Sequence, residues 1–262
     1  TTGDYNTAVG YLTGAGVTTG IQNTLMGAGA GDVLDVGGYN VALGSFSLTT
    51  DTKGSKSIAV GHGALNAQNF TSATDTYNVA VGHQAGVAVT TGTKNTFIGG
   101  LVGDANTTGS DHVAIGYQAL SANTTANINT AVGYQALLVN TTGWGNLALG
   151  PNTLDANTTG LKNISVGGFS LTANTTGGSN VAVGYNALLA NTTASYNIAV
   201  GANALDANTT GEYNVALGTS SLTTATTADH NTAVGADALG SNTTGTSNVG
   251  IGSGALVFTT TG

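Results

Sequence analysis

Short apolar runs recur along this chain at a fixed interval, and a glycine ends each run. The run from Asn129 to Gly133 is typical: asparagine, a β-branched residue or leucine, alanine, an aliphatic residue, then glycine. Fifteen copies occur, and thirteen of their fourteen intervals are 17 residues, while the remaining one is 21. A short fixed period over a whole chain indicates one supersecondary unit stacked on itself. The closing glycines are Gly10, Gly27, Gly44, Gly61, Gly82, Gly99, Gly116, Gly133, Gly150, Gly167, Gly184, Gly201, Gly218, Gly235 and Gly252.

The residues between asparagine and glycine are rich in valine, isoleucine and threonine, which is typical of a short strand. Seventeen residues leave room for one such strand and its turns. The pattern therefore predicts an all-β fold, a parallel β-solenoid (β-roll) of fifteen 17-residue rungs. We expect a single repeat domain over 1–262, as a segment of a longer fibre. The one long interval places a four-residue insertion loop within 66–77.

Two positions in each rung exchange bulk: where the side chain at one position is large, the residue at the other is small. The residue two before the glycine is alanine in eleven copies, and the residue four after it is leucine in eleven copies. Where the alanine becomes large, at Leu25 and Phe97, the leucines of that rung and of the preceding rung are glycines. Close packing demands such compensation if both positions share one core. The predicted core includes Leu137, Leu188, Leu205, Ala182, Leu25 and Phe97.

The residues on either side of the alanine, such as Val181 and Val183, must point to the opposite face of the strand. They are apolar in all fifteen copies on the glycine side and in ten on the asparagine side. A strand that is apolar on both faces is buried on both faces. Two arrangements would achieve this: identical copies around a three-fold axis, or a monomeric coil with two core layers.

The repeat Asn-Val-Ala-Val-Gly-x-x-Ala-Leu, as in residues 180–188, resembles the head repeats of YadA-like trimeric autotransporter adhesins and similar repeats of bacteriophage tail fibres. The resemblance covers all fifteen copies, although each rung here is three residues longer. It implies an intertwined left-handed homotrimer. It also implies an extracellular fibre shaft or adhesin head, on a cell surface or a virion, that acts in attachment and as a stiff spacer.

Composition narrows the function classes. Twelve acidic residues face four lysines and no arginine, which gives a net charge of −8. Nucleic-acid binding needs basic side chains to replace phosphate counterions, so no nucleic-acid partner is expected. No apolar run reaches 18 residues, so no membrane insertion is expected either. The acids are scattered and His62 and His83 have no obvious third ligand beside them, so we expect no enzyme, no metal and no cofactor.

Asparagines recur at two positions of the rung. Those that open the strands should stack into a hydrogen-bonded ladder, as in cross-β structures; the ladder includes Asn163, Asn180, Asn197 and Asn214. Asn-Thr-Thr triplets recur at a second position and are formally N-glycosylation sequons. We favour a turn at these triplets, because glycans on successive rungs would crowd one another. The possible acceptors are Asn106, Asn123, Asn140, Asn157, Asn174, Asn191, Asn208 and Asn242.

Aromatic residues are the remaining binding candidates. Phe70 lies in the predicted insertion loop, and loops often carry recognition. Tyr117, Tyr134 and Tyr185 share the position after the glycine and could stack on cell-surface glycans. The alternative function is a monomeric β-solenoid that binds ice or glycans, although neighbouring threonines such as Thr141 and Thr142 should face opposite ways. The chain itself is the main expected partner, in a homotrimer and in an end-to-end filament of such segments.

Overall fold

The computed structural model describes residues 3–261, whose contacts divide into two compact units, residues 3–129 and residues 130–261. All regular secondary structure in this part of the chain is β, and it contains no helix long and apolar enough to cross a bilayer. The single repeat domain over 1–262 stays a prediction.

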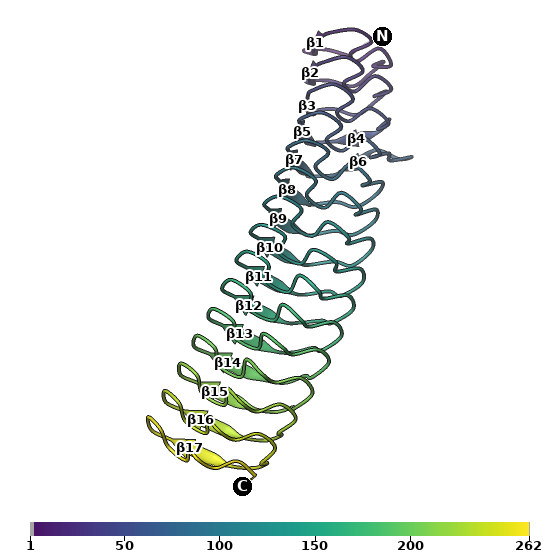
Figure 1. Cartoon of the computed structure of the whole chain (residues 1–262). Coiled ribbons are helices and arrows are strands. Elements are labelled where there is room, and N and C mark those ends of the chain that lie inside the picture. The colour runs from purple at the N-terminus through teal and green to yellow at the C-terminus, as the bar shows by residue number, and fades with distance from the viewer. Residues whose placement is uncertain (1–2, 262) are drawn as a thin grey trace. The chain divides into compact units, whose positions relative to one another are not determined.

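The first unit is a stack of parallel three-residue strands, one for each rung, with two shorter strands, β4 and β6, paired in a separate sheet (Figure 1). Partners lie 17 residues apart along the chain, as in Ala8 with Leu25, except across the long interval, where Ala59 pairs with Ala80. The strands of this unit are β1 (Thr7–Val9), β2 (Thr24–Met26), β3 (Val41–Leu43), β4 (Gly54–Ser55), β5 (Ile58–Val60), β6 (Thr74–Asp75), β7 (Val79–Val81), β8 (Thr96–Ile98) and β9 (Val113–Ile115).

The second unit repeats the arrangement without interruption. Its strands pair in parallel in chain order, with Ala131 opposite Ala148 and Ala182 opposite Ala199. The predicted all-β, parallel β-solenoid with a 17-residue rung is therefore confirmed. The strands are β10 (Thr130–Val132), β11 (Leu147–Leu149), β12 (Ile164–Val166), β13 (Val181–Val183), β14 (Ile198–Val200), β15 (Val215–Leu217), β16 (Thr232–Val234) and β17 (Val249–Ile251).

The interior of each rung consists of the alanine of the strand and the leucine that follows it. Ala182 and Leu188 are both fully buried, as are Leu137, Leu205, Leu25 and Phe97. The exchange of bulk is confirmed as well. A Cβ added at Gly103 would lie 2.6 Å from Cε1 of Phe97, and one at Gly14 would lie 2.8 Å from Cδ1 of Leu25. The glycines therefore make room for the two large side chains.

The turns use left-handed backbone at several fixed positions of the rung. In the rung of β13 the closing Gly184 has φ +139°, and Asn186 and Leu188 follow with φ +57° and +52°. The residue before the opening asparagine is also left-handed, as at Tyr196 with φ +63°. Positive φ is most unfavourable for β-branched side chains. This explains why the buried position of the turn holds leucine or glycine and never valine or isoleucine.

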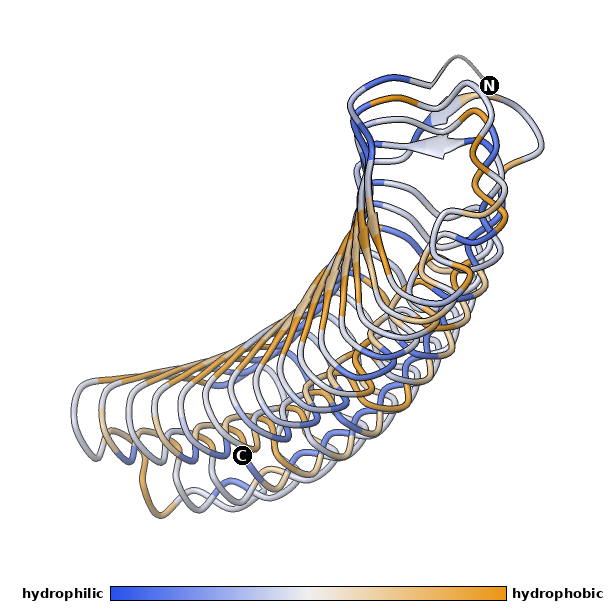
Figure 2. Ribbon diagram, turned by 90° about the horizontal axis from the view of Figure 1, so that it is seen from above, coloured by the Kyte–Doolittle hydropathy of each residue, from blue (hydrophilic) through white to orange (hydrophobic). Residues whose placement is uncertain are grey.

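The outer face of each sheet is also apolar, but nothing within the coil covers it. Val200 and Leu149 are 38% and 44% exposed, and their neighbours on adjacent strands are exposed or half-buried. Figure 2 shows the apolar strand residues as orange segments that lie side by side in each unit. The alternative of a monomeric coil with two core layers is therefore wrong, because one layer lies inside and the other is on the surface.

The long interval forms a lateral loop, as predicted. β4 and β6 add a second pair of parallel strands, with Gly54 opposite Thr74, and the chain just before β6 projects from the side of the coil (Figure 1). The strands β5 and β7 on either side keep the ordinary register. The extra residues are thus expelled from the stack, which leaves the sheet intact.

Candidate functional site

The asparagines that open the strands form the predicted ladder inside the coil. The backbone N–H of Asn180 donates to Oδ1 of Asn163 at 3.0 Å, and Nδ2 of Asn180 donates to the carbonyl of Ala194 at 2.8 Å. Asn197 and Asn214 repeat both contacts on the next rungs. Each amide therefore links its own rung to the preceding one and also ties its strand to the opposite wall of the coil.

The Asn-Thr-Thr asparagines form a second ladder, and the possibility that they carry glycans is wrong for the folded chain. Nδ2 of Asn191 donates to Oδ1 of Asn174 at 2.9 Å and to the carbonyl of Ala194 at 3.1 Å. An N-linked glycan would have to be attached to this buried nitrogen. All eight candidate acceptors are 0% exposed: Asn106, Asn123, Asn140, Asn157, Asn174, Asn191, Asn208 and Asn242.

His112 replaces an asparagine of the first ladder and reproduces its contacts. Its Nδ1 accepts the backbone N–H of Asn129 at 3.1 Å, while its Nε2 donates to the carbonyl of Ala126 at 2.7 Å. These contacts require the neutral ring with its proton on Nε2. Burial lowers the pKa of His112, against the smaller effect of its backbone hydrogen bonds. This histidine is a structural element of the ladder.

Phe70 is not an exposed contact residue, contrary to the sequence-based prediction. Its side chain is 6% exposed, and its backbone N–H donates to Oδ1 of the buried Asp51 at 3.2 Å. The other oxygen of Asp51 accepts Nε2 of Gln68 at 2.6 Å. A buried polar network, which the sequence did not reveal, thus anchors the base of the insertion. The phenylalanine covers this network, and the loop tip at 71–73 is exposed instead.

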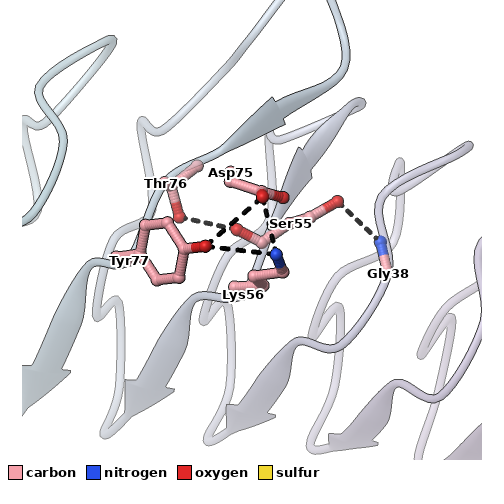
Figure 3. A network of polar contacts seen from close by, with 6 residues as sticks. All are labelled: Gly38, Ser55, Lys56, Asp75, Thr76 and Tyr77. Carbon is pink, nitrogen blue, oxygen red and sulfur yellow. Dashed lines mark hydrogen bonds and ion pairs between the residues drawn. The ribbon is translucent and has the colours of Figure 1, made fainter.

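A second polar cluster lies beside the insertion, at the strand pair β4 and β6 (Figure 3). Nζ of Lys56 pairs with Oδ2 of Asp75 at 2.6 Å and donates to the hydroxyl of Tyr77 at 3.2 Å. The hydrogen bond to Asp75 is the main cause that raises the pKa of Lys56. The ammonium also lies 5.1 Å from the centre of the Tyr77 ring. Lys56 and Tyr77 occupy the same position on successive rungs.

The tyrosines proposed from the sequence are exposed but do not form a continuous platform within a unit. Tyr117, Tyr134 and Tyr185 are 47%, 52% and 56% exposed. In the second unit, Pro151 and Gly168 occupy this position on the two rungs between Tyr134 and Tyr185. The ring of Tyr185 instead meets Phe169 edge-on, with centroids 5.9 Å apart.

A different position carries a continuous aromatic stack, formed by Tyr196, Tyr213 and His230. Their ring centroids lie 5.0 and 5.1 Å apart, and the ring planes are 6° and 2° from parallel. All three rings are exposed at the surface of the second unit. Sequence reasoning missed this stack, although its signal was present: the residue before the opening asparagine is aromatic on three successive rungs. We call Tyr196, Tyr213 and His230 the aromatic stack.

The two threonines of each Asn-Thr-Thr turn face opposite ways, as predicted. Oγ1 of Thr158 donates to the carbonyl of Thr175 at 3.0 Å, whereas Thr159 is exposed. The second threonines of these turns form one exposed column in the second unit. The residues two further along are mixed in size and charge, and include Trp144, Gly178 and Asp229. This face therefore lacks the two matched rows of threonine that a regular ice-binding surface would present.

No group of three or more metal-ligating side chains lies together among residues 3–261. His62 and His83 stack on each other with centroids 5.3 Å apart, on the surface of the first unit. Asp155 has a buried carboxylate oxygen without a hydrogen-bond partner, and desolvation raises its pKa. The chain matches no model of a known protein family, and neither curated proteins nor solved structures give a significant match to it.

Proposed function

We propose that this chain is a structural segment of an extracellular fibre, either a shaft or an adhesin head, built from three copies that pack through the outer faces of their sheets. The resemblance of its rung to adhesin and tail-fibre repeats supports three copies. The fibre would serve as a stiff spacer in attachment, and it would need no catalytic group.

The uncovered apolar face of the strands carries the proposal. Each of the strands β10 to β17 presents two outward side chains, nearly all of them valine, isoleucine or leucine. Monomeric soluble proteins rarely expose a contiguous apolar surface of this kind. Burial of apolar surface contributes about 25 cal/mol per Å². Because the rows repeat with the rung, copies of this chain would meet one another in register.

The single threonine column weakens the alternative of an ice-binding monomer. That alternative needs a flat, regular, exposed face, whereas the regular exposed rows among residues 3–261 are the apolar strand rows and one threonine row. Contact with another protein surface would remove the apolar rows from water, which is more favourable than leaving them exposed to water or ice.

The test is the native mass of the chain in solution, measured by multi-angle light scattering. Three times the chain mass of 25.5 kDa is expected. Val200→Asp places a charge in the proposed interface and should yield single chains. The matched control Thr193→Asp changes an exposed side chain in the turn that precedes the same strand and should leave the trimer intact. Circular dichroism of both variants checks that the fold is retained.

A wild-type mass of one chain would overturn the proposed assembly. Equal dissociation by both variants would place the interface elsewhere on the rung. Polydisperse filaments from the wild type would indicate that end-to-end contacts dominate over the lateral ones.

A further inference from the structure

We propose that the first ring of the aromatic stack, Tyr196, is a binding site for an ammonium group carried by a saccharide or other ligand. This inference does not rest on the trimeric assembly, because the aromatic stack lies beside the strand rows and belongs to a single chain.

The fold does not require aromatic residues at this position. The residue before the opening asparagine is Gly145, Ser179 or Ser247 on other rungs of the same unit, all with similar left-handed backbone. At Tyr196 and His230 the backbone N–H groups make the same inter-rung hydrogen bond as Ser179 does, to the carbonyls of Gly178 and Glu212. Three exposed rings on successive rungs therefore need a reason beyond folding.

Only the terminal faces of the stack are open to a ligand. Two six-membered rings cannot lie edge to edge with centroids 5.0 Å apart, so rings that are parallel at this distance overlap face to face. Tyr213 is thus covered on both faces, by Tyr196 and by His230. The other face of Tyr196 looks towards the preceding rung, where Gly178 and Ser179 offer almost no side chain.

The chain itself shows what binds to such a ring face. Lys56 occupies the same position as Ser179, and its ammonium lies at the hydroxyl end of the Tyr77 ring on the next rung, 5.1 Å from the ring centre, where it also pairs with Asp75. In the second unit, Nζ of Lys162 lies 4.8 Å from the ring of Trp144. Cations in this range are attracted by the negative ring face. At Tyr196 the corresponding lysine is absent, so the ring face is vacant for a cation from outside.

The charges nearby favour the same ligand. Glu212 and Asp229 directly precede Tyr213 and His230 in the chain, and neither carboxylate is paired with a cation, since the ion pair found among residues 3–261 is that of Lys56 with Asp75. The chain carries a net charge of −8. These carboxylates lie on the two rungs beyond Tyr196, away from its open face, and raise the concentration of cations around the aromatic stack.

The binding test uses two probes that differ in charge: oligomers of glucosamine, which carry free ammonium groups, and the same oligomers in N-acetylated form. Titration calorimetry on the wild-type chain should detect the ammonium form, with an affinity that falls as salt rises. Tyr196→Ala should weaken this binding about tenfold. Glu212→Gln should weaken it about two- to threefold.

The sharpest control is a variant in which a lysine of the chain itself occupies the proposed ammonium site. Ser179→Lys should place its own ammonium next to the ring of Tyr196, and it should abolish binding of the ammonium probe while it leaves the melting temperature unchanged or raised. Ser179→Gln adds a side chain without charge and should retain most of the affinity. Ser247→Lys adds the same charge beyond the far end of the aromatic stack and should retain binding at Tyr196.

Three results would overturn the inference: equal binding of the acetylated oligomers, undiminished binding by Ser179→Lys, or no binding of the ammonium form. The first would assign a neutral saccharide to the aromatic stack. The native mass of each variant, measured in parallel, separates a failure of this site from a failure of the proposed trimer.

Discussion

The two units are built from the same kind of rung, but they place different residues at its second asparagine position. The second unit places Asn140, Asn157, Asn174, Asn191 and Asn208 there on successive rungs and thus builds two parallel ladders. The first unit begins with Val17, Leu34, Asp51, Gln68 and Val89 at the same position, and asparagine appears only from Asn106 onwards. The comparison shows that the fold tolerates apolar, acidic and amide side chains at this position.

The first ladder shows far fewer replacements of its asparagines. Its two departures in the described chain, Ser57 and His112, both keep the ladder connected. His112 supplies an acceptor and a donor where an asparagine would, and Gln68 reaches across to donate to Oγ of Ser57 at 2.9 Å. Oε1 of Gln68 then accepts Nδ2 of Asn78 at 2.9 Å. The replaced positions of the first ladder therefore keep buried polar contacts, whereas the second position also accepts apolar side chains.

Removal of the large core residue of the first unit should have the largest effect. Phe97→Ala should lower the free energy of unfolding by about 3–5 kcal/mol, because the glycines around it cannot fill the cavity. The double variant Phe97→Ala with Gly103→Leu should recover part of this loss, since it recreates the alanine and leucine pair of other rungs. Denaturant unfolding measures both; a double variant less stable than Phe97→Ala alone would contradict the exchange of bulk.

The matching change in the second unit is Leu188→Ala. It should cost about 2–5 kcal/mol, as for other buried leucines. Hydrogen exchange should localise the loss to the rungs next to β13, because contacts in a solenoid reach only neighbouring rungs. A variant that unfolds like the wild type would show that this leucine is not part of the core.

Valine substitutions should lower the free energy of unfolding by different amounts in the two ladders. Asn163→Val removes the acceptor of the buried Asn180 N–H and should cost about 2–3 kcal/mol, mainly as the penalty of an unsatisfied donor. Asn174→Val should cost about 1 kcal/mol or less, because Nδ2 of Asn191 keeps its bond to Ala194 and valine already occurs here in the first unit. Equal losses on denaturant unfolding would contradict the ranking of the two ladders.

A fall in pH should change the stability of the two units in opposite directions. These changes should be smaller than those caused by the substitutions above. The pKa of His112 is lowered in the folded chain, so its stabilising contribution is complete above the ordinary value of 6.5 and is lost as pH falls below it. The pKa of Asp155 is raised above 3.8, so its ionised form costs stability at neutral pH and the cost disappears in acid.

Hydrogen exchange between pH 7 and 5 should therefore show loosening around β9 in the first unit. His112→Asn should remove this pH dependence, because an asparagine cannot titrate. Asp155→Asn provides the control in the second unit and should leave the behaviour of β9 unchanged. Persistent loosening around β9 in His112→Asn would exclude the histidine as its cause.

The sequence was sufficient for the rung, the core and the first ladder because each depends on contacts that repeat with the period. The Ala182 and Leu188 positions and the compensating glycines could be inferred from volume alone. The buried state of Phe70 and of the Asn-Thr-Thr asparagines could not, because it depends on how the turn closes over the coil. Likewise, the aromatic stack is formed by residues before the strand, whose left-handed backbone gives them a direction that strand alternation does not predict.

The parallel register has a consequence for how such a gene can change. Hydrogen bonds between the backbones of neighbouring rungs join residues 15 to 18 positions apart, except across the long interval. The deletion or duplication of a whole rung therefore leaves each remaining rung with an equivalent neighbour. Any other change in length must be expelled sideways, as at residues 66–77. The number of rungs can therefore vary through simple recombination between repeats, while point mutations inside the rung remain tightly constrained.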